Sequence, residues 1–133
     1  MRIYVGYRYT GADKDALKIF LTSIGETLKI SGHSTFMYFR DGGNWEGKEG
    51  KIPLDKVIRE SFDQIAKADA ALFLLQNNNF SEGMLLDIGC AIALKKKVYL
   101  AKKIGCSLPK TESLATQIIE YESDSELLSK LIL

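Results

Sequence analysis

The stretch "DAALFLLQNNNFSEGMLLDIGCAIALKKKVYLAK", residues 69–102, decides the fold, because its pattern predicts a strand, a helix and a second strand in succession. Its first part, 69–75, is a continuous apolar run typical of a strand that is buried on both faces. Ser81 is a plausible N-cap, and the small and apolar residues after it predict a helix. "KVYLAK" (97–102) predicts the next strand. Two strands joined through a helix in this way pair in parallel by a right-handed crossover.

The same alternation of strands and helices extends along the rest of the chain. The other expected elements are a strand at 2–7, a helix at about 15–30 with Asp13 as N-cap, a strand at 34–39, a helix with Pro53 in its first turn, a strand at 117–123 and a terminal helix at 125–133. We therefore expect one α/β domain over residues 1–133, of the flavodoxin-like, doubly wound type. Its parallel sheet has four to five strands, with helices on both faces.

Composition limits the classes of partner and cofactor. The 133 residues carry 18 basic and 17 acidic side chains, a formal net charge of +1, which argues against a nucleic acid polymer or an anionic membrane as partner. The N-terminus lacks the apolar core of a signal peptide, so we expect a cytoplasmic protein. With two cysteines and one histidine, we expect no metal and no cofactor.

Asp87 is the one charged residue between Gly83 and Leu94. It either points to solvent from the surface of a helix, or lies in a desolvated place where carboxylates serve as nucleophiles or acid/base groups. Ser81 and Gly83 stand one turn earlier, where the open amides of a helix start bind an anion or a sugar hydroxyl, or where they only begin the helix.

The loop "GYRYTGAD" (6–13) follows the first strand and has the composition of a turn that holds a phosphate or a sugar. Its candidates are Gly6, Tyr7, Arg8 and Gly11. It fits neither of the two common glycine-rich phosphate-binding motifs, so a tight connection between strand and helix is the alternative.

Two further candidates follow the second strand, near the expected ligand edge beyond the carboxyl ends of the strands, and a third lies on a helix stripe that faces the sheet. Asp41 either faces a ligand or forms a turn before two glycines. Trp45 either stacks on a nucleobase or packs back on the domain. Ser61 interrupts an apolar helical stripe, and its alternative role is a hydroxyl bonded to the preceding turn.

Three segments resemble the nucleoside 2-deoxyribosyltransferase superfamily, which includes the deoxynucleoside monophosphate N-glycosidases. They are "IYVGYRYTGAD" (3–13), "AKADAALFLL" (66–75) and "SEGMLLDIGCAIALKKKVYLA" (81–101). The last segment is the most specific, since the family has Ser-x-Gly followed by an acid six residues after the serine. Ser81, Gly83 and Asp87 fall in that register.

The resemblance implies that Asp87 attacks the anomeric carbon of a (deoxy)ribosyl group and displaces the base, after which water or a second base takes the sugar. It also implies a homodimer. Under this resemblance Tyr7, Arg8 and Gly11 hold sugar or phosphate, Ser81 and Gly83 hold the other side of the sugar, and Trp45 or Phe80 covers the base. The sequence departs from the family twice, with Asp87 in place of Glu and Ser61 in place of Asp.

"FRDGGNWEGKEGKIPLDKVIRESFDQI" (39–65) more distantly resembles the Toll/interleukin-1 receptor domain, some members of which split the N-glycosidic bond of NAD. The sequence therefore predicts cleavage or transfer at the N-glycosidic bond of a nucleoside or nucleotide. The alternative is a non-catalytic nucleotide-binding or Toll/interleukin-1 receptor-like signalling module, for example one that binds NAD.

Overall fold

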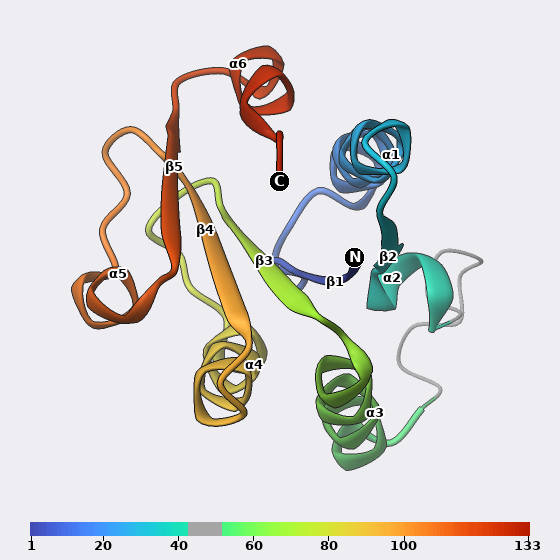
Figure 1. Ribbon diagram of the computed structural model, residues 1–133. Helices are drawn as coiled ribbons and strands as arrows, with labels where there is room; N and C mark the ends of the chain where they lie inside the picture. Colours follow the sequence, from blue (N-terminus) through green and yellow to red (C-terminus); the bar gives the residue numbers. More distant parts are fainter. Residues whose placement is uncertain (43–51) are drawn as a thin grey trace.

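One parallel sheet organises residues 1–42 and 52–133, which are the residues that the computed structural model describes. Its five strands lie in the order β2-β1-β3-β4-β5 (Figure 1). They are β1 (Arg2–Gly6), β2 (Ser34–Phe36), β3 (Ala70–Leu75), β4 (Lys97–Lys103) and β5 (Gln117–Tyr121). All neighbouring strands are parallel, in the strand order of flavodoxin-like folds. The predicted doubly wound α/β fold is confirmed.

Helices cover both faces of the sheet. The helices are α1 (Lys14–Ile30), α2 (Tyr38–Asp41), α3 (Leu54–Lys67), α4 (Glu82–Ala93), α5 (Pro109–Leu114) and α6 (Asp124–Lys130). Helices α1 and α6 lie on one side of the sheet, and α3 and α4 lie on the other (Figure 1). None of these helices is long and apolar enough to cross a membrane.

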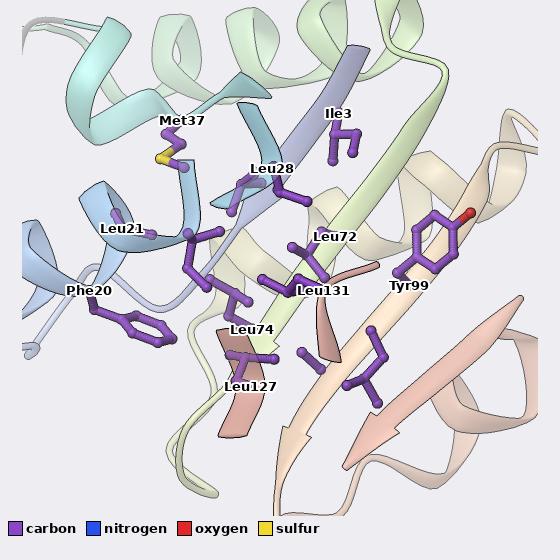
Figure 2. Packing of buried hydrophobic residues seen from close by; sticks show 14 of the residues in the cluster. Ile3, Phe20, Leu21, Leu28, Met37, Leu72, Leu74, Tyr99, Leu127 and Leu131 are labelled. Carbon is purple, nitrogen blue, oxygen red and sulfur yellow. The ribbon is translucent and has the colours of Figure 1, made fainter. Parts of the chain in front are cut away.

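Each face of the sheet has its own core, because neighbouring residues of a strand point to opposite faces. Ile3 and Val5 point to the α1 side, where they join one apolar cluster. Figure 2 shows Ile3 in this cluster with Leu21, Leu72 and Leu127. Tyr4 lies between Ile3 and Val5 in the sequence and points to the other face. There it belongs to a second cluster with residues of β3, β4, α3 and α4. Tyr4 therefore lies on the same side of the sheet as the helix that carries Asp87.

The predicted caps of α1 and α4 are confirmed. The Asp13 carboxylate accepts the backbone N–H groups of Asp15 and Ala16 at 3.0 and 3.1 Å. The Ser81 hydroxyl accepts the N–H of Met84 at 3.1 Å. Such caps satisfy amides that have no partner within the helix, and each stabilises its helix by about 1 kcal/mol.

The predicted strand at 34–39 is wrong in its second half, because β2 ends at Phe36 and α2 begins at Tyr38. Two polar side chains explain the difference. Asp41 accepts the Met37 backbone N–H at 2.9 Å, and Arg40 donates to the Thr35 carbonyl oxygen at 2.6 Å. These local bonds fold the chain back into a helical turn, although the apolar pattern favours a strand.

Two smaller differences concern prolines. Pro53 is the N-cap residue of α3, one position before the predicted first turn. Pro109 begins α5, a short helix that is not among the elements expected from the sequence. In α5, the Glu112 carboxylate accepts the Leu108 N–H at 2.8 Å and pairs with Lys102, which supports this short helix.

Candidate active site

Asp87 is joined to the first strand by a hydrogen bond. The Tyr4 phenol donates to Asp87 Oδ2 at 2.7 Å, which connects β1 to α4. Tyr4 is buried, with 2% of its surface exposed, and Asp87 is half-buried. Of the two orientations that the sequence leaves open for Asp87, the structure has the inward one.

Burial raises the pKa of Asp87 to about 6, and the hydrogen bond from Tyr4 acts against this increase. The carboxylate is therefore mostly ionised at neutral pH and mostly protonated at pH 5 or below. Burial, and then the charge of Asp87, raise the pKa of Tyr4 well above its ordinary value. Tyr4 consequently remains a protonated donor throughout the range in which Asp87 titrates.

A cavity of about 530 Å³ opens beside this pair, within the size range of sites for small ligands. It lies at the carboxyl end of β1, between α2, α3 and α4. Its walls come from β1 and the loop after it, from α2, from α3, and from the start of α4. They include Tyr4, Gly6, Tyr7, Tyr9, Tyr38, Phe39, Leu54, Ser61, Phe80, Ser81, Glu82, Gly83, Leu86 and Asp87. The cavity thus contains most of the residues that the sequence proposes.

Tyr7 contributes a phenol whose oxygen is already engaged. This oxygen accepts the backbone N–H of Phe39 at 2.6 Å, which ties the end of β1 to α2. Burial raises the pKa of Tyr7, so its hydroxyl keeps the proton and can donate it to a ligand. The hydroxyl of Tyr9, also on the cavity wall, is buried without a hydrogen-bond partner among the described residues.

Ser61 lies on the α3 wall and is 5% exposed. Its hydroxyl donates to the Val57 carbonyl oxygen at 3.1 Å, as the alternative interpretation of this residue expects. Ser61 also acts on Tyr4, because its nearby hydroxyl lowers the pKa of the Tyr4 phenol, against the larger effects of burial and of Asp87. Its position beside Tyr4 places it in the same polar group as Asp87.

The structure explains the two glycines on the cavity wall, Gly6 and Gly83, in different ways. A Cβ on Gly6 would lie 2.4 Å from the Phe73 ring, so packing within the sheet requires this glycine. A Cβ on Gly83 would meet nothing within 4 Å, so no protein neighbour requires that glycine. The open space at Gly83 adjoins the cavity and allows close approach by a ligand.

Arg8 and Gly11 line a different cavity, of about 270 Å³, between the start of α1 and the loop after β3. Phe80 and Met84 belong to the walls of both cavities. Successive residues of the loop after β1 thus face different cavities, with Tyr7 and Tyr9 in one and Arg8 in the other.

Of the two remaining candidates, Asp41 is not among the described lining residues of the cavity. Asp41 lies in α2, where its carboxylate accepts the Met37 N–H and pairs with Arg40 at 2.8 Å. Trp45 lies outside the described residues. Within residues 1–42 and 52–133, no three His, Cys, Asp or Glu side chains are grouped to hold a metal ion.

Sequence reasoning missed Tyr4 and Glu82. A signal for Tyr4 exists in the strand pattern, since Tyr4 alternates with Ile3 and Val5, and a buried tyrosine needs a partner for its hydroxyl. The identity of that partner depends on the packing of α4 against β1. Glu82 lies between Ser81 and Gly83, and no sequence feature distinguishes it from an exposed first-turn acid.

Several solved structures share this fold at low sequence identity. The chain matches the CMP N-glycosidase BcmB of Clostridium botulinum with a TM-score of 0.72 and 19% identity, over 98% of this chain and 97% of that one. It matches a 2-deoxyribosyltransferase of Bacillus psychrosaccharolyticus with a TM-score of 0.69 and 16% identity, over 96% and 90%. It matches BlsM with a TM-score of 0.75 and 17% identity, over 96% and 85%.

More distant matches include the SEFIR domain of IL-17 receptor B and a flavodoxin-like domain from Synechococcus, with TM-scores of 0.58 and 0.54. No protein-family model matches the sequence, and no curated protein is significantly similar to it. At these identities the likeness concerns the fold, and it confirms the structural resemblance that the three sequence segments predict.

Proposed function

We propose that the protein cleaves the N-glycosidic bond of a nucleoside or nucleotide, or transfers its sugar to another base, with Asp87 as the nucleophile. The observation that carries this proposal is the position of Asp87, a half-buried carboxylate on the wall of a ligand-sized cavity and held by Tyr4. Two of the matched folds belong to a CMP N-glycosidase and a 2-deoxyribosyltransferase, which supports this class of reaction.

The reaction proceeds in two steps at the anomeric carbon. Asp87 Oδ1, which takes no part in the bond to Tyr4, attacks that carbon while the bond to the base nitrogen breaks. The base leaves with the bonding electron pair. Water or a second base then attacks the same carbon from the vacated face and releases Asp87, so the sugar keeps its original configuration.

The surrounding residues position the sugar. Tyr7 donates its phenol proton to a sugar oxygen, and Gly83 lets the sugar approach the first turn of α4, which Ser81 caps. Phe80 covers part of the base. Arg8 and Gly11 remain candidates for a phosphate that extends past Phe80 into the second cavity.

A homodimer and a cytoplasmic location are parts of the same proposal. Leu85 and Leu86 on α4 are each 42% exposed, and Leu54 at the rim of the cavity is 74% exposed. A second copy that covers these side chains would also narrow the cavity mouth. Light scattering tests this: we expect the mass of a dimer, and the mass of a monomer for Leu85→Glu. Cys90 and Cys106 are free thiols, which suits a reducing compartment.

The direct test follows the release of free base by chromatography, with each common nucleoside, deoxynucleoside and monophosphate. We expect release by the wild type and a loss of at least about a thousandfold for Asp87→Ala. Asp63→Asn, an exposed change on α3, is the matched control and keeps full activity. Undiminished release by Asp87→Ala would overturn the proposal.

A second candidate is a binding module without turnover, favoured by the hydroxyl of Ser61 in place of a second carboxylate. In that case nucleotides or NAD raise the unfolding temperature of the protein while no base is released. Base release that depends on Asp87 excludes this candidate.

A further inference from the structure

Helix α2 forms one wall of the cavity beside Asp87, although a helix of four residues is not stable without contacts to the rest of the fold. Tyr38 and Phe39 are lining residues of that cavity. Arg40 instead lines a separate pocket of about 410 Å³ beside α1 and β2, which we call the α1–β2 pocket. Neighbouring residues of α2 thus serve two different surroundings.

The guanidinium of Arg40 fastens α2 to the edge strand β2. Its Nη2 donates to the Thr35 carbonyl oxygen at 2.6 Å and to Thr35 Oγ1 at 3.2 Å. Its Nε and Nη2 donate to the two carboxylate oxygens of Asp41 at 2.9 and 2.8 Å. Asp41 in turn accepts the Met37 N–H at the start of α2. A rigid, planar group therefore fixes both ends of this short helix.

Helix α1 provides the space for this guanidinium. A Cβ on Gly25 would lie 3.2 Å from Arg40 Nη1 and 3.2 Å from the Met37 methyl carbon. Gly25 lies in the interior of α1, where glycine destabilises a helix by about 1 kcal/mol relative to alanine. Close packing against Arg40 explains why a glycine occupies this position. Three elements, α1, β2 and α2, thus meet at one side chain.

The residue before Arg40 joins α2 to the cavity beside Asp87. The Phe39 backbone N–H donates to the Tyr7 phenol oxygen at 2.6 Å, and the Phe39 ring packs edge-on against Tyr9. A hydroxyl that accepts one hydrogen bond is polarised and becomes a better donor of its own proton. The position of α2 therefore affects both the place and the donor strength of the Tyr7 hydroxyl.

We propose that Arg40 is a positioning residue for the reaction: by holding α2 against β2, it fixes the Tyr7 hydroxyl that donates to the sugar. This inference rests on the proposed function and deepens it, because it assigns control of sugar binding to a residue outside the cavity lining. The alternative is that Arg40 only shields the edge of the sheet, as charged side chains on edge strands do. That role does not involve Tyr7.

The test is a double-mutant cycle of Arg40→Gln and Tyr7→Phe, with KM and kcat for base release from one nucleoside as the readout. Arg40→Gln should raise KM about fivefold to tenfold, as the loss of one hydrogen bond does, and change kcat by less than about twofold. In Tyr7→Phe, which lacks the hydroxyl, the same substitution should leave KM unchanged. Lys29→Ala is the control, because Lys29 is an exposed residue of the same α1–β2 pocket.

Gly25→Ala is a second variant that keeps the guanidinium and its charge. The added methyl group crowds Arg40 Nη1, which is held at its acceptors and cannot withdraw freely. We expect KM to rise by about twofold to threefold, and again only when the Tyr7 hydroxyl is present. Because alanine favours a helix over glycine, loss of α1 would not account for this result.

Hydrogen exchange of the Phe39 N–H, followed by NMR, gives a readout that does not depend on turnover. Arg40→Gln should speed this exchange about tenfold and leave that of Leu21 in α1 unchanged. Unchanged exchange at Phe39, or an equal effect of Arg40→Gln on KM with and without the Tyr7 hydroxyl, overturns the inference while the proposed function stands. If the exchange responds but the wild type releases no base, the proposed function fails, and the role of Arg40 in the reaction fails with it.

Discussion

The phenol of Tyr4 donates a 2.7 Å hydrogen bond to the carboxylate of Asp87, although the two residues are 83 positions apart in the sequence. The bond joins the central strand β1 to the helix that follows β3. It fixes one oxygen of a carboxylate that burial would otherwise protonate more readily. The predictions below concern this pair and the cavity beside it.

The first prediction concerns pH. Because burial raises the pKa of Asp87 to about 6, kcat/KM should rise with pH through about 6 as the nucleophile ionises. The rate of base release, measured from about pH 4 to 8 with one nucleoside, checks this. A profile that is flat between about pH 5 and 7 would argue against Asp87 as the ionising group.

Tyr4→Phe should move this profile. The substitution removes the hydrogen bond that lowers the pKa of Asp87, so the acid limb should shift to higher pH. The loss of a hydrogen bond to a charged group should reduce kcat/KM at neutral pH by about tenfold to a hundredfold. Tyr99→Phe is a suitable control, because Tyr99 is buried on the opposite face of the sheet. An unshifted acid limb would show that Tyr4 has only a packing role.

Asp87→Asn should stabilise the fold at neutral pH. The folded-state pKa of about 6 lies above the ordinary value of 3.8, so the native protein binds more protons than the unfolded chain between these values. Stability conferred by the wild-type residue is therefore present below about pH 4 and is lost as pH rises through about 6. The variant avoids this loss, which amounts to about 3 kcal/mol at neutral pH.

Urea unfolding at about pH 7.5 and pH 4 measures this difference. The free energy of unfolding of Asp87→Asn should exceed that of the wild type at the higher pH and approach it at the lower. Equal stabilities at the higher pH would mean that Asp87 is better solvated than its position indicates.

Gly83→Ala should weaken substrate binding and at the same time raise the free energy of unfolding. Apart from its chain neighbours and the backbone of its own helix, no described atom lies within 4 Å of the added methyl group, and alanine favours a helix over glycine by about 1 kcal/mol. A sugar that approaches this turn would meet the methyl group, so KM should rise about tenfold. Gly89→Ala is the matched control in the same helix, since Gly89 also faces open space but lies away from the cavity. An unchanged KM for Gly83→Ala would place the sugar elsewhere.

Local and periodic patterns were enough to predict the fold. The strand, helix and strand of 69–102, and the caps Asp13 and Ser81, depend on interactions between residues close in sequence. Residues 38–41 were mispredicted because the side chains of Arg40 and Asp41 bind the backbone in competition with the strand pattern.

The candidate site was less accessible to sequence reasoning, because its contacts join distant segments. Asp87 and Ser81 stand out in one helix, but the partner of Asp87 comes from β1. Adjacent residues of the loop after β1 also face different cavities, with Tyr7 at one cavity and Arg8 at the other. No local sequence pattern predicts either relationship, because each depends on how the loop and α4 pack at the end of the sheet.

The most direct test of the account is the mass of the protein during turnover. A 2-deoxy-2-fluoro nucleoside slows the second step, so acid quenching and intact-mass spectrometry should detect a covalent sugar adduct, located by peptide mapping on Asp87. Asp87→Asn should show no adduct. Base release without an adduct on Asp87, or an adduct that persists in Asp87→Asn, would contradict the role of Asp87 as nucleophile.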